Sequence, residues 1–199
     1  RPAGETGSAG TRQACSRRVA STYIFVQGSG AIAGIRNETL PKAMINEVYN
    51  KRIIELAGNI PRLGRLPDAD ATATAHSKLC GSTVTVDIKM DGDAVTDFAH
   101  EVKACALGQA SSSIMARNIV GATAAELRKL RETVRAMLKE NGAPPGGKWA
   151  EIAVLEPVRD YKARHASTML TFDAVVDAIG QIEARRGKAM AAEQAAPSA

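Results

Sequence analysis

A block of strand-type sequence restricts the fold of this chain more than any other feature. Between residues 71 and 104, β-branched and apolar residues alternate with polar ones, as they do in strands that bury one face. Asp91-Gly92-Asp93 interrupts the alternation in the way a hairpin turn does. We therefore expect three antiparallel strands, at residues 71–76, 82–90 and 94–104.

Outside this block the apolar residues recur with helical spacing. The helices expected from this spacing are residues 45–57, 111–120, 123–141 and 166–186. Strands grouped in one part of the chain, with helices after them, are typical of α+β proteins. The sequence thus predicts a small antiparallel three-stranded sheet that is covered on one side by helices.

Composition excludes some classes of function. The chain has 199 residues and a formal net charge of +5, but aromatic residues make up only 4% and do not interleave with Lys or Arg. Single-strand nucleic-acid binders combine a basic groove with aromatic stacking platforms. No apolar stretch reaches the roughly 20 residues that span a bilayer. We expect neither a nucleic acid nor a membrane as partner.

The chain divides into three parts by composition. Residues 1–43 are rich in Arg, Ser and Gly and poor in acidic residues, which is the composition of a transit segment. Alternatively they are non-native upstream sequence, because a helix-type pattern begins abruptly after Met44. Residues 44–187 form the predicted domain, and residues 188–199 a flexible tail. The expected location is the cytoplasm, or the mitochondrial matrix if residues 1–43 are a transit segment.

Two cysteines carry most of the functional information. The three cysteines are Cys15, Cys80 and Cys105, an odd number at wide spacing, which favours free thiols in a reducing compartment over a disulfide framework. Cys80 follows a strand, and Cys105 precedes a helix that we expect to begin near Ser111. A helix N-terminus favours the thiolate form of a nearby cysteine.

The order of these elements resembles a known family. The Cys80-Gly81 turn, the Asp91-Gly92 hairpin and Cys105 followed by Ala110-Ser111-Ser112-Ser113 are similar to the iron–sulfur cluster assembly scaffolds of the IscU, SufU and NifU N-terminal type. The resemblance implies a protein that receives sulfur from a cysteine desulfurase. It also implies binding of iron or a nascent iron–sulfur cluster, with zinc as a further candidate, and transfer of the cluster to acceptor proteins.

The resemblance extends to only half of the ligand set. Such a scaffold is implied to use three cysteines and an aspartate, and Cys80 and Cys105 match two of these positions. Ser82 stands where the resemblance implies the aspartate, and Ser167 where it implies the third cysteine. His165 lies two residues before Ser167, and imidazole is a good ligand for zinc or iron. The candidate metal ligands are therefore Cys80, Cys105, Ser167 and His165.

Structural interpretations of the same residues remain open. Ser167 also suits a helix N-cap, His165 an ordinary surface or half-buried position, and the cysteines buried packing. Leu155-Glu156-Pro157-Val158-Arg159 is similar to the segment that an Hsp70-class chaperone engages in IscU-type scaffolds. It also suits a loop that contains one proline.

Three functions follow from these observations. The first is an iron–sulfur cluster assembly scaffold with an incomplete ligand set. The second is an accessory or structural subunit that has the scaffold fold but does not build clusters by itself. The third is a zinc-dependent sulfur acceptor for a cysteine desulfurase, with Cys105 as the accepting thiol. No catalytic triad, phosphate-binding glycine loop or paired catalytic carboxylate is evident, so we do not expect an enzyme.

Overall fold

The computed structural model describes residues 50–195. The predicted helix opening at Met44, the segment 1–43 with Cys15, and the last four residues lie outside this range. The described elements, in chain order, are α2 (Lys51–Gly58), β1 (Ala71–His76), β2 (Thr83–Asp91), β3 (Ala94–Lys103), α3 (Ala106–Asn118), α4 (Ala124–Lys139), the 3-10 segment η1 (Gly147–Asp160) and α5 (Lys162–Ala195).

The three strands form one antiparallel sheet in the order β1-β2-β3. Thr83 of β2 lies opposite both His76 of β1 and Lys103 of β3. The β2–β3 hairpin turns at Gly92, whose φ of 55° is a conformation that glycine adopts without a steric cost. The predicted strands are confirmed to within one residue at each end.

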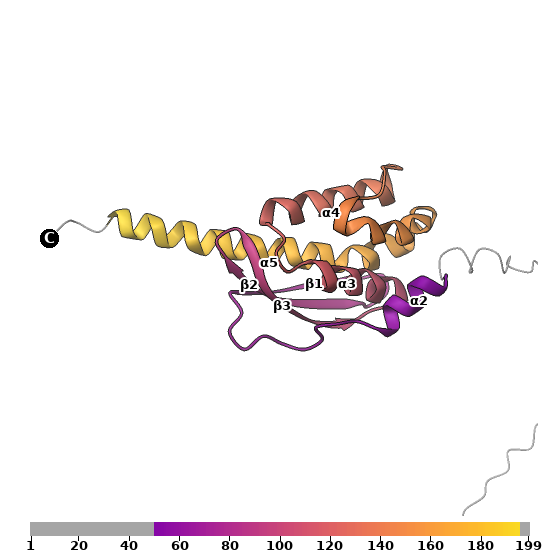
Figure 1. Cartoon of the computed structure of the whole chain (residues 1–199), viewed down its shortest axis with the longest axis horizontal. Helices are drawn as coiled ribbons and strands as arrows, with labels where there is room; N and C mark the ends of the chain where they lie inside the picture. Colours follow the sequence, from indigo (N-terminus) through magenta and orange to yellow (C-terminus); the bar gives the residue numbers. More distant parts are fainter. Residues whose placement is uncertain (1–49, 196–199) are drawn as a thin grey trace, which may run out of the picture. The chain divides into compact units, whose positions relative to one another are not determined.

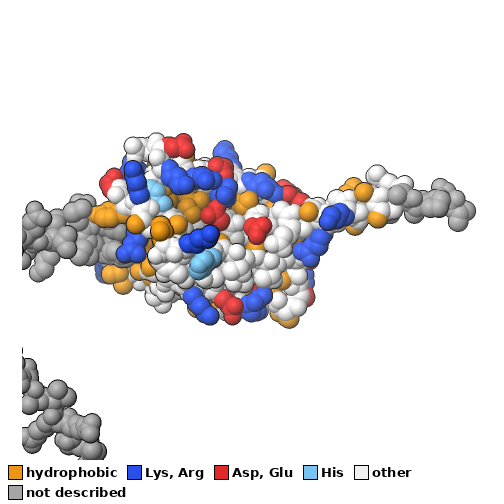
Figure 2. Space-filling view, turned by 180° about the vertical axis from the view of Figure 1, so that it is seen from behind, with side chains coloured by type: hydrophobic (Ala, Val, Ile, Leu, Met, Phe, Trp, Pro, Cys, Tyr) orange, Lys and Arg blue, Asp and Glu red, His pale blue; other side chains and the backbone are white. Residues whose placement is uncertain are grey.

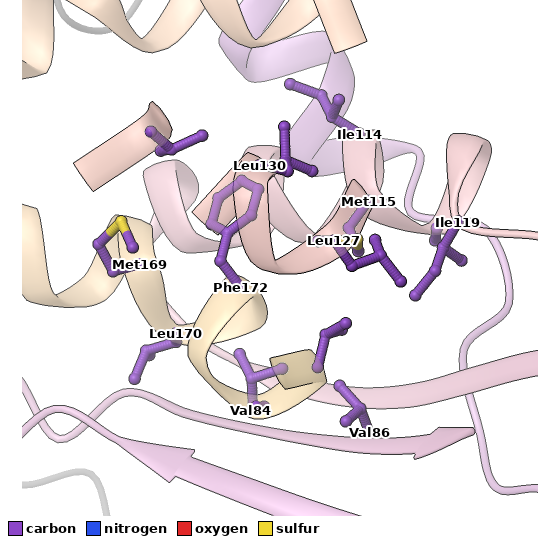
Figure 3. Close-up of a cluster of buried hydrophobic side chains, with 14 of the residues drawn as sticks. Val84, Val86, Ile114, Met115, Ile119, Leu127, Leu130, Met169, Leu170 and Phe172 are labelled. Atoms are coloured by element: carbon purple, nitrogen blue, oxygen red, sulfur yellow. The ribbon is translucent and has the colours of Figure 1, made fainter. Parts of the chain in front are cut away.

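Helices cover one face of this sheet, so the predicted α+β fold is confirmed (Figure 1). Alternate residues of β2 point into a core that also contains apolar side chains of α3, α4 and α5. Figure 3 shows this arrangement, with Phe172 of α5 between the sheet and the residues of α3 and α4. The labelled core residues are Val84, Val86, Ile114, Met115, Ile119, Leu127, Leu130, Met169, Leu170 and Phe172.

A loop between α2 and β1 lies across the opposite face of the sheet, and Arg65 anchors it. Its guanidinium binds Asp87 of β2 through Nε at 2.6 Å and Nη2 at 3.0 Å. The Asp87 side chain is fully buried and also accepts hydrogen bonds from Thr72 Oγ1 and the Leu66 amide. Burial raises the pKa of Asp87, but Arg65 and these hydrogen bonds outweigh it and hold the pKa below its ordinary value.

The helix that follows Cys105 begins earlier than predicted. We expected its start near Ser111, but α3 starts at Ala106 with Cys105 as the N-cap, a position at which serine is the more usual residue. Ser111 is buried inside the helix, where its hydroxyl donates to the Gly108 carbonyl. Packing against the core therefore overrides the local preference of serine.

The last helix is longer than predicted at both ends. It begins at Lys162 rather than 166 and continues through Gly187 to Ala195. The N-cap interpretation of Ser167 is therefore wrong, because this residue lies in the second turn. None of the helices among residues 50–195 is both long enough and apolar enough to cross a membrane.

The segment 155–159 is neither extended nor a loop. It belongs to η1, in which Leu155 and Val158 are fully buried. The N-terminal part of η1 is held by Trp149, whose indole donates a hydrogen bond to Glu126 of α4. A chaperone that reads this segment as an extended peptide would first have to release it from the core.

Replacing Asp87 with Asn should lower the free energy of unfolding at neutral pH by about 2–3 kcal/mol, because Arg65 loses a buried charged partner. The folded-state pKa of Asp87 is lowered, so its stabilising contribution is present above the unfolded-state pKa. That contribution disappears as the pH falls through the folded-state pKa. Urea unfolding at neutral and acid pH should therefore show the two proteins converging in acid.

Glu183→Gln provides the control. Glu183 pairs with Arg128, but both side chains are roughly half exposed. Exposed pairs contribute about 0–1 kcal/mol. An equal loss of stability in both variants would contradict the role given to Asp87.

Candidate functional site: a pair of thiols at one end of the sheet

The two described cysteines lie at the same end of the sheet. Cys80 is in the loop of residues 77–82 that joins β1 to β2, and Cys105 follows the end of β3 by two residues. Because Thr83 pairs with Lys103, the chain before β2 and the chain after β3 leave the sheet side by side. The register of the sheet thus brings together the segments that carry the two cysteines, which are 25 positions apart in the sequence.

Cys80 is exposed at the tip of a tight turn. The Ser77 amide donates to the Ser82 carbonyl, and the Gly81 amide donates to the Ser77 carbonyl. Gly81 has a φ of 69°, which other residue types adopt only with strain. The turn places Cys80 Sγ 3.3 Å from Ser77 Oγ and 3.0 Å from Ser82 Oγ, and both serines are nearly fully buried.

These neighbours favour the thiolate of Cys80. Hydrogen bonds from the Ser77 hydroxyl, the Ser82 hydroxyl and the Ser82 amide lower the pKa of Cys80 to about 7, and the charge of Arg164 adds to the effect. A large share of Cys80 is therefore ionised near neutral pH. The thiolate is the form that binds metals and attacks sulfur.

Cys105 occupies a more enclosed position. It is the half-buried N-cap of α3, and its Sγ lies 3.4 Å from Ser167 Oγ. The fully buried Ser167 donates its own hydroxyl hydrogen to the Arg164 carbonyl at 3.0 Å. The serine oxygen is thus left to accept the thiol hydrogen of Cys105.

One face of helix α5 carries side chains that interact with both thiols. Arg164 and Ser167 are three residues apart, which places them on the same side of a helix. The charge of Arg164 acts on Cys80, and the hydroxyl of Ser167 lies next to Cys105. Sequence analysis missed Ser77 and Arg164. The spacing Ser77-x-x-Cys80-x-Ser82 in a hairpin loop was the available signal for Ser77, and the position of Arg164 one turn before Ser167 was the signal for Arg164.

His165 does not join this group. Its Nε2 lies 3.1 Å from the Val158 carbonyl and 3.0 Å from the Arg159 carbonyl, to which the ring donates. A step of two residues along a helix turns the side chain by about 200°, so His165 and Ser167 point to opposite sides. His165 lines a cleft between α4 and α5 instead.

The other two histidines have structural partners. His76 Nδ1 lies 3.1 Å from Thr83 Oγ1 across the β1–β2 pair. His100 is fully buried, its Nε2 hydrogen bonds to the Pro61 carbonyl, and burial lowers its pKa. Within residues 50–195, no three His, Cys, Asp or Glu side chains are grouped so that they could hold a metal ion.

A small α+β fold with two free thiols at one end of its sheet is the architecture of the iron–sulfur cluster assembly scaffold class. Residues 48–189 match the family described as NifU-like N terminal domain. This match covers well over half of the chain, and the chain belongs to that family. The resemblance seen in the sequence is therefore confirmed.

Individual relatives agree with this assignment. The crystal structure of a nitrogen-fixing NifU-like protein (N-terminal) from Brucella abortus is 68% identical, with a TM-score of 0.70 over 70% of this chain and 97% of that chain. The iron-sulfur cluster assembly scaffold protein IscU of Thermotoga maritima is 25% identical over 68% of this chain and 94% of its own length. The zinc-dependent sulfurtransferase SufU of Bacillus subtilis is 23% identical, over 71% and 95% respectively.

Replacing Ser82 with Ala should raise the pKa of Cys80 from about 7 toward its ordinary value, because the thiolate loses a hydrogen-bond donor. The pH dependence of the ultraviolet absorbance of the thiolate measures this change in a Cys15→Ala/Cys105→Ala background. Thr74→Ala, which removes an exposed hydroxyl from β1, should leave the pKa unchanged. An unchanged pKa in Ser82→Ala would contradict the role of this serine.

Proposed function

We propose that this protein acts in iron–sulfur cluster assembly as a scaffold-type protein. Cys80 and Cys105 are the protein ligands of its cargo, which is iron or a nascent iron–sulfur cluster. The observation that carries the proposal is the pairing of two free thiols at one sheet end, one of them with a pKa of about 7. Membership of the NifU-like family and the names of its relatives support it.

The chemistry of the two thiols suits temporary binding of iron or a nascent cluster. Iron in clusters is held by cysteine thiolates, usually four. The described part of this chain offers two, and the hydroxyls of Ser77, Ser82 and Ser167 lie next to them. A neutral hydroxyl is a harder and weaker ligand than a thiolate. Cargo bound in this way is held loosely and stays accessible at the exposed Cys80, which favours transfer to an acceptor protein.

The donor set does not fit a resident zinc ion. Structural zinc sites take four Cys, His or carboxylate ligands, and catalytic sites take three. Among residues 50–195 no group of three such side chains is present, and the ring of His165 is turned away from the thiols. The SufU relative is named as zinc-dependent, but the described part of this chain has no set of zinc ligands.

A second candidate function is sulfur acceptance from a cysteine desulfurase. The Cys80 thiolate would attack the terminal sulfur of a persulfide on the desulfurase. The sulfur–sulfur bond of that persulfide breaks, a persulfide forms on Cys80, and the desulfurase cysteine leaves as a thiolate. We predicted Cys105 as the acceptor from the sequence. The exposure and lowered pKa of Cys80 favour Cys80 instead.

The proposed partners follow from these two functions. They are a cysteine desulfurase as sulfur donor and acceptor proteins for the assembled cluster. An accessory role within a larger assembly complex remains the alternative from a different class, and the first experiment below separates it from autonomous scaffolding. Cytoplasmic location stays a prediction.

Anaerobic reconstitution with iron, a desulfurase and cysteine tests the scaffold function. The wild-type protein should bind iron and sulfide and show charge-transfer absorption, whereas Cys80→Ala and Cys105→Ala should each lose most of both. Cys15→Ala is the matched control and should retain them. A wild-type protein without bound iron or sulfide would contradict autonomous scaffolding and favour the accessory role.

Transfer of labelled sulfur tests the second candidate. With a desulfurase and labelled cysteine, Cys80→Ala should retain less than about a tenth of the label carried by the wild type, because it lacks the attacking thiolate. Cys105→Ala and Cys15→Ala should each retain most of it. Label found on Cys105 in the wild-type protein would contradict the assignment to Cys80.

A further inference from the structure

A basic cleft lies between α4 and α5. It has a volume of ≈ 850 Å³, within the range of small-ligand sites. Its lining has three more cationic than acidic side chains. The charged residues are Arg131, Arg135, Lys139, Arg159, Lys162, Asp160 and Asp173. Figure 2 shows one face of the molecule, and Lys and Arg side chains gather in its upper left part.

This cleft is separate from the thiol pair. His165 and Met169 of α5 line it, whereas Arg164 and Ser167 act on the cysteines. The two groups lie on different sides of the same helix, because successive residues turn by about 100°. The cluster assembly function proposed above therefore leaves the cleft without a role.

Two of the five cations are neutralised by carboxylates. Arg131 Nε lies 2.6 Å from Asp173 Oδ1, and Arg159 pairs with Glu156. These ion pairs join α4 to α5 and stiffen the end of η1. They help to hold the walls of the cleft in place.

The other three cations have no such partner. Among the described residues, no carboxylate lies within ion-pair distance of Arg135, Lys139 or Lys162. Arg135 is half-buried in this setting. Asp160, which also lines the cleft, has no ion-pair partner among the described residues either, so the unpaired charges are three positive and one negative. A concave surface with such an excess of unpaired positive charge attracts anionic counter-ions. The N-terminus of α5, which has no acidic residue in its first turn, adds further positive potential at the edge of the cleft.

We propose that this cleft binds a small polyanion that carries two or three clustered phosphate or carboxylate groups. Three separate cations require an anion of matching multiplicity, and guanidinium groups bind both kinds of oxyanion. None of the described lining residues is Phe, Tyr or Trp, so the lining provides no stacking surface for a nucleobase. Recognition rests on the anionic groups themselves.

Calorimetric titration of the full chain with inorganic tripolyphosphate and, separately, with citrate tests the proposal. Saturable binding of at least one probe that weakens with added salt is expected, and the stronger probe identifies phosphate or carboxylate as the source. Arg135→Ala/Lys162→Ala should weaken binding about tenfold or more, because each change removes a charge-assisted hydrogen bond. Arg135→Lys should retain most of it.

The control removes two exposed charges elsewhere. Lys129→Ala/Lys188→Ala should bind as the wild type does, because neither lysine lines this cleft. Three results would overturn the proposal: no saturable binding of either probe, equal weakening in the control, or binding of an acidic peptide alone. None of them affects the cysteine experiments, so the two proposals fail independently.

Discussion

The close crossing of α3 and α5 at Gly108 is the contact on which the arrangement of the thiol pair depends. A Cβ atom at this position would lie 2.9 Å from the Ser167 carbonyl and 2.8 Å from the Ala104 Cβ, so no larger residue fits without movement. Gly108 is one turn after Cys105. The crossing therefore sets the distance between the Cys105 thiol and the Ser167 hydroxyl, and with it the position of Arg164.

Ser82 and Ser167 are two serines that determine the chemistry of the thiol pair. The hydroxyl of Ser82 lowers the pKa of Cys80, and the oxygen of Ser167 accepts from Cys105. Both serines are buried, so their orientation is defined by packing. The result is a site in which one thiol is exposed and partly ionised while its neighbour is enclosed. Such asymmetry suits handling of sulfur or of a loosely bound cluster better than permanent metal binding.

Helix α5 contributes to the core, to the thiol pair and to the basic cleft. Its core side carries Phe172 and Leu170, and its first two turns present Arg164 and Ser167 to the cysteines. A different side lines the basic cleft. The helix is fixed against η1 by His165, which donates to two carbonyls and is therefore a structural residue in the described fold. One rigid element thus supports two separate surfaces.

The sequence by itself determined the strands, the hairpin at Gly92 and the α+β class, because alternation of residue types and turn chemistry are local properties. It also singled out Cys80 and Cys105 as the candidate functional thiols. Only the tertiary structure decided which neighbours each cysteine has. Arg164 is 84 positions from Cys80, and His165 is turned away from the site although it is adjacent in sequence. These outcomes depend on how α5 crosses α3 and the sheet, and side-chain packing between distant elements sets that crossing.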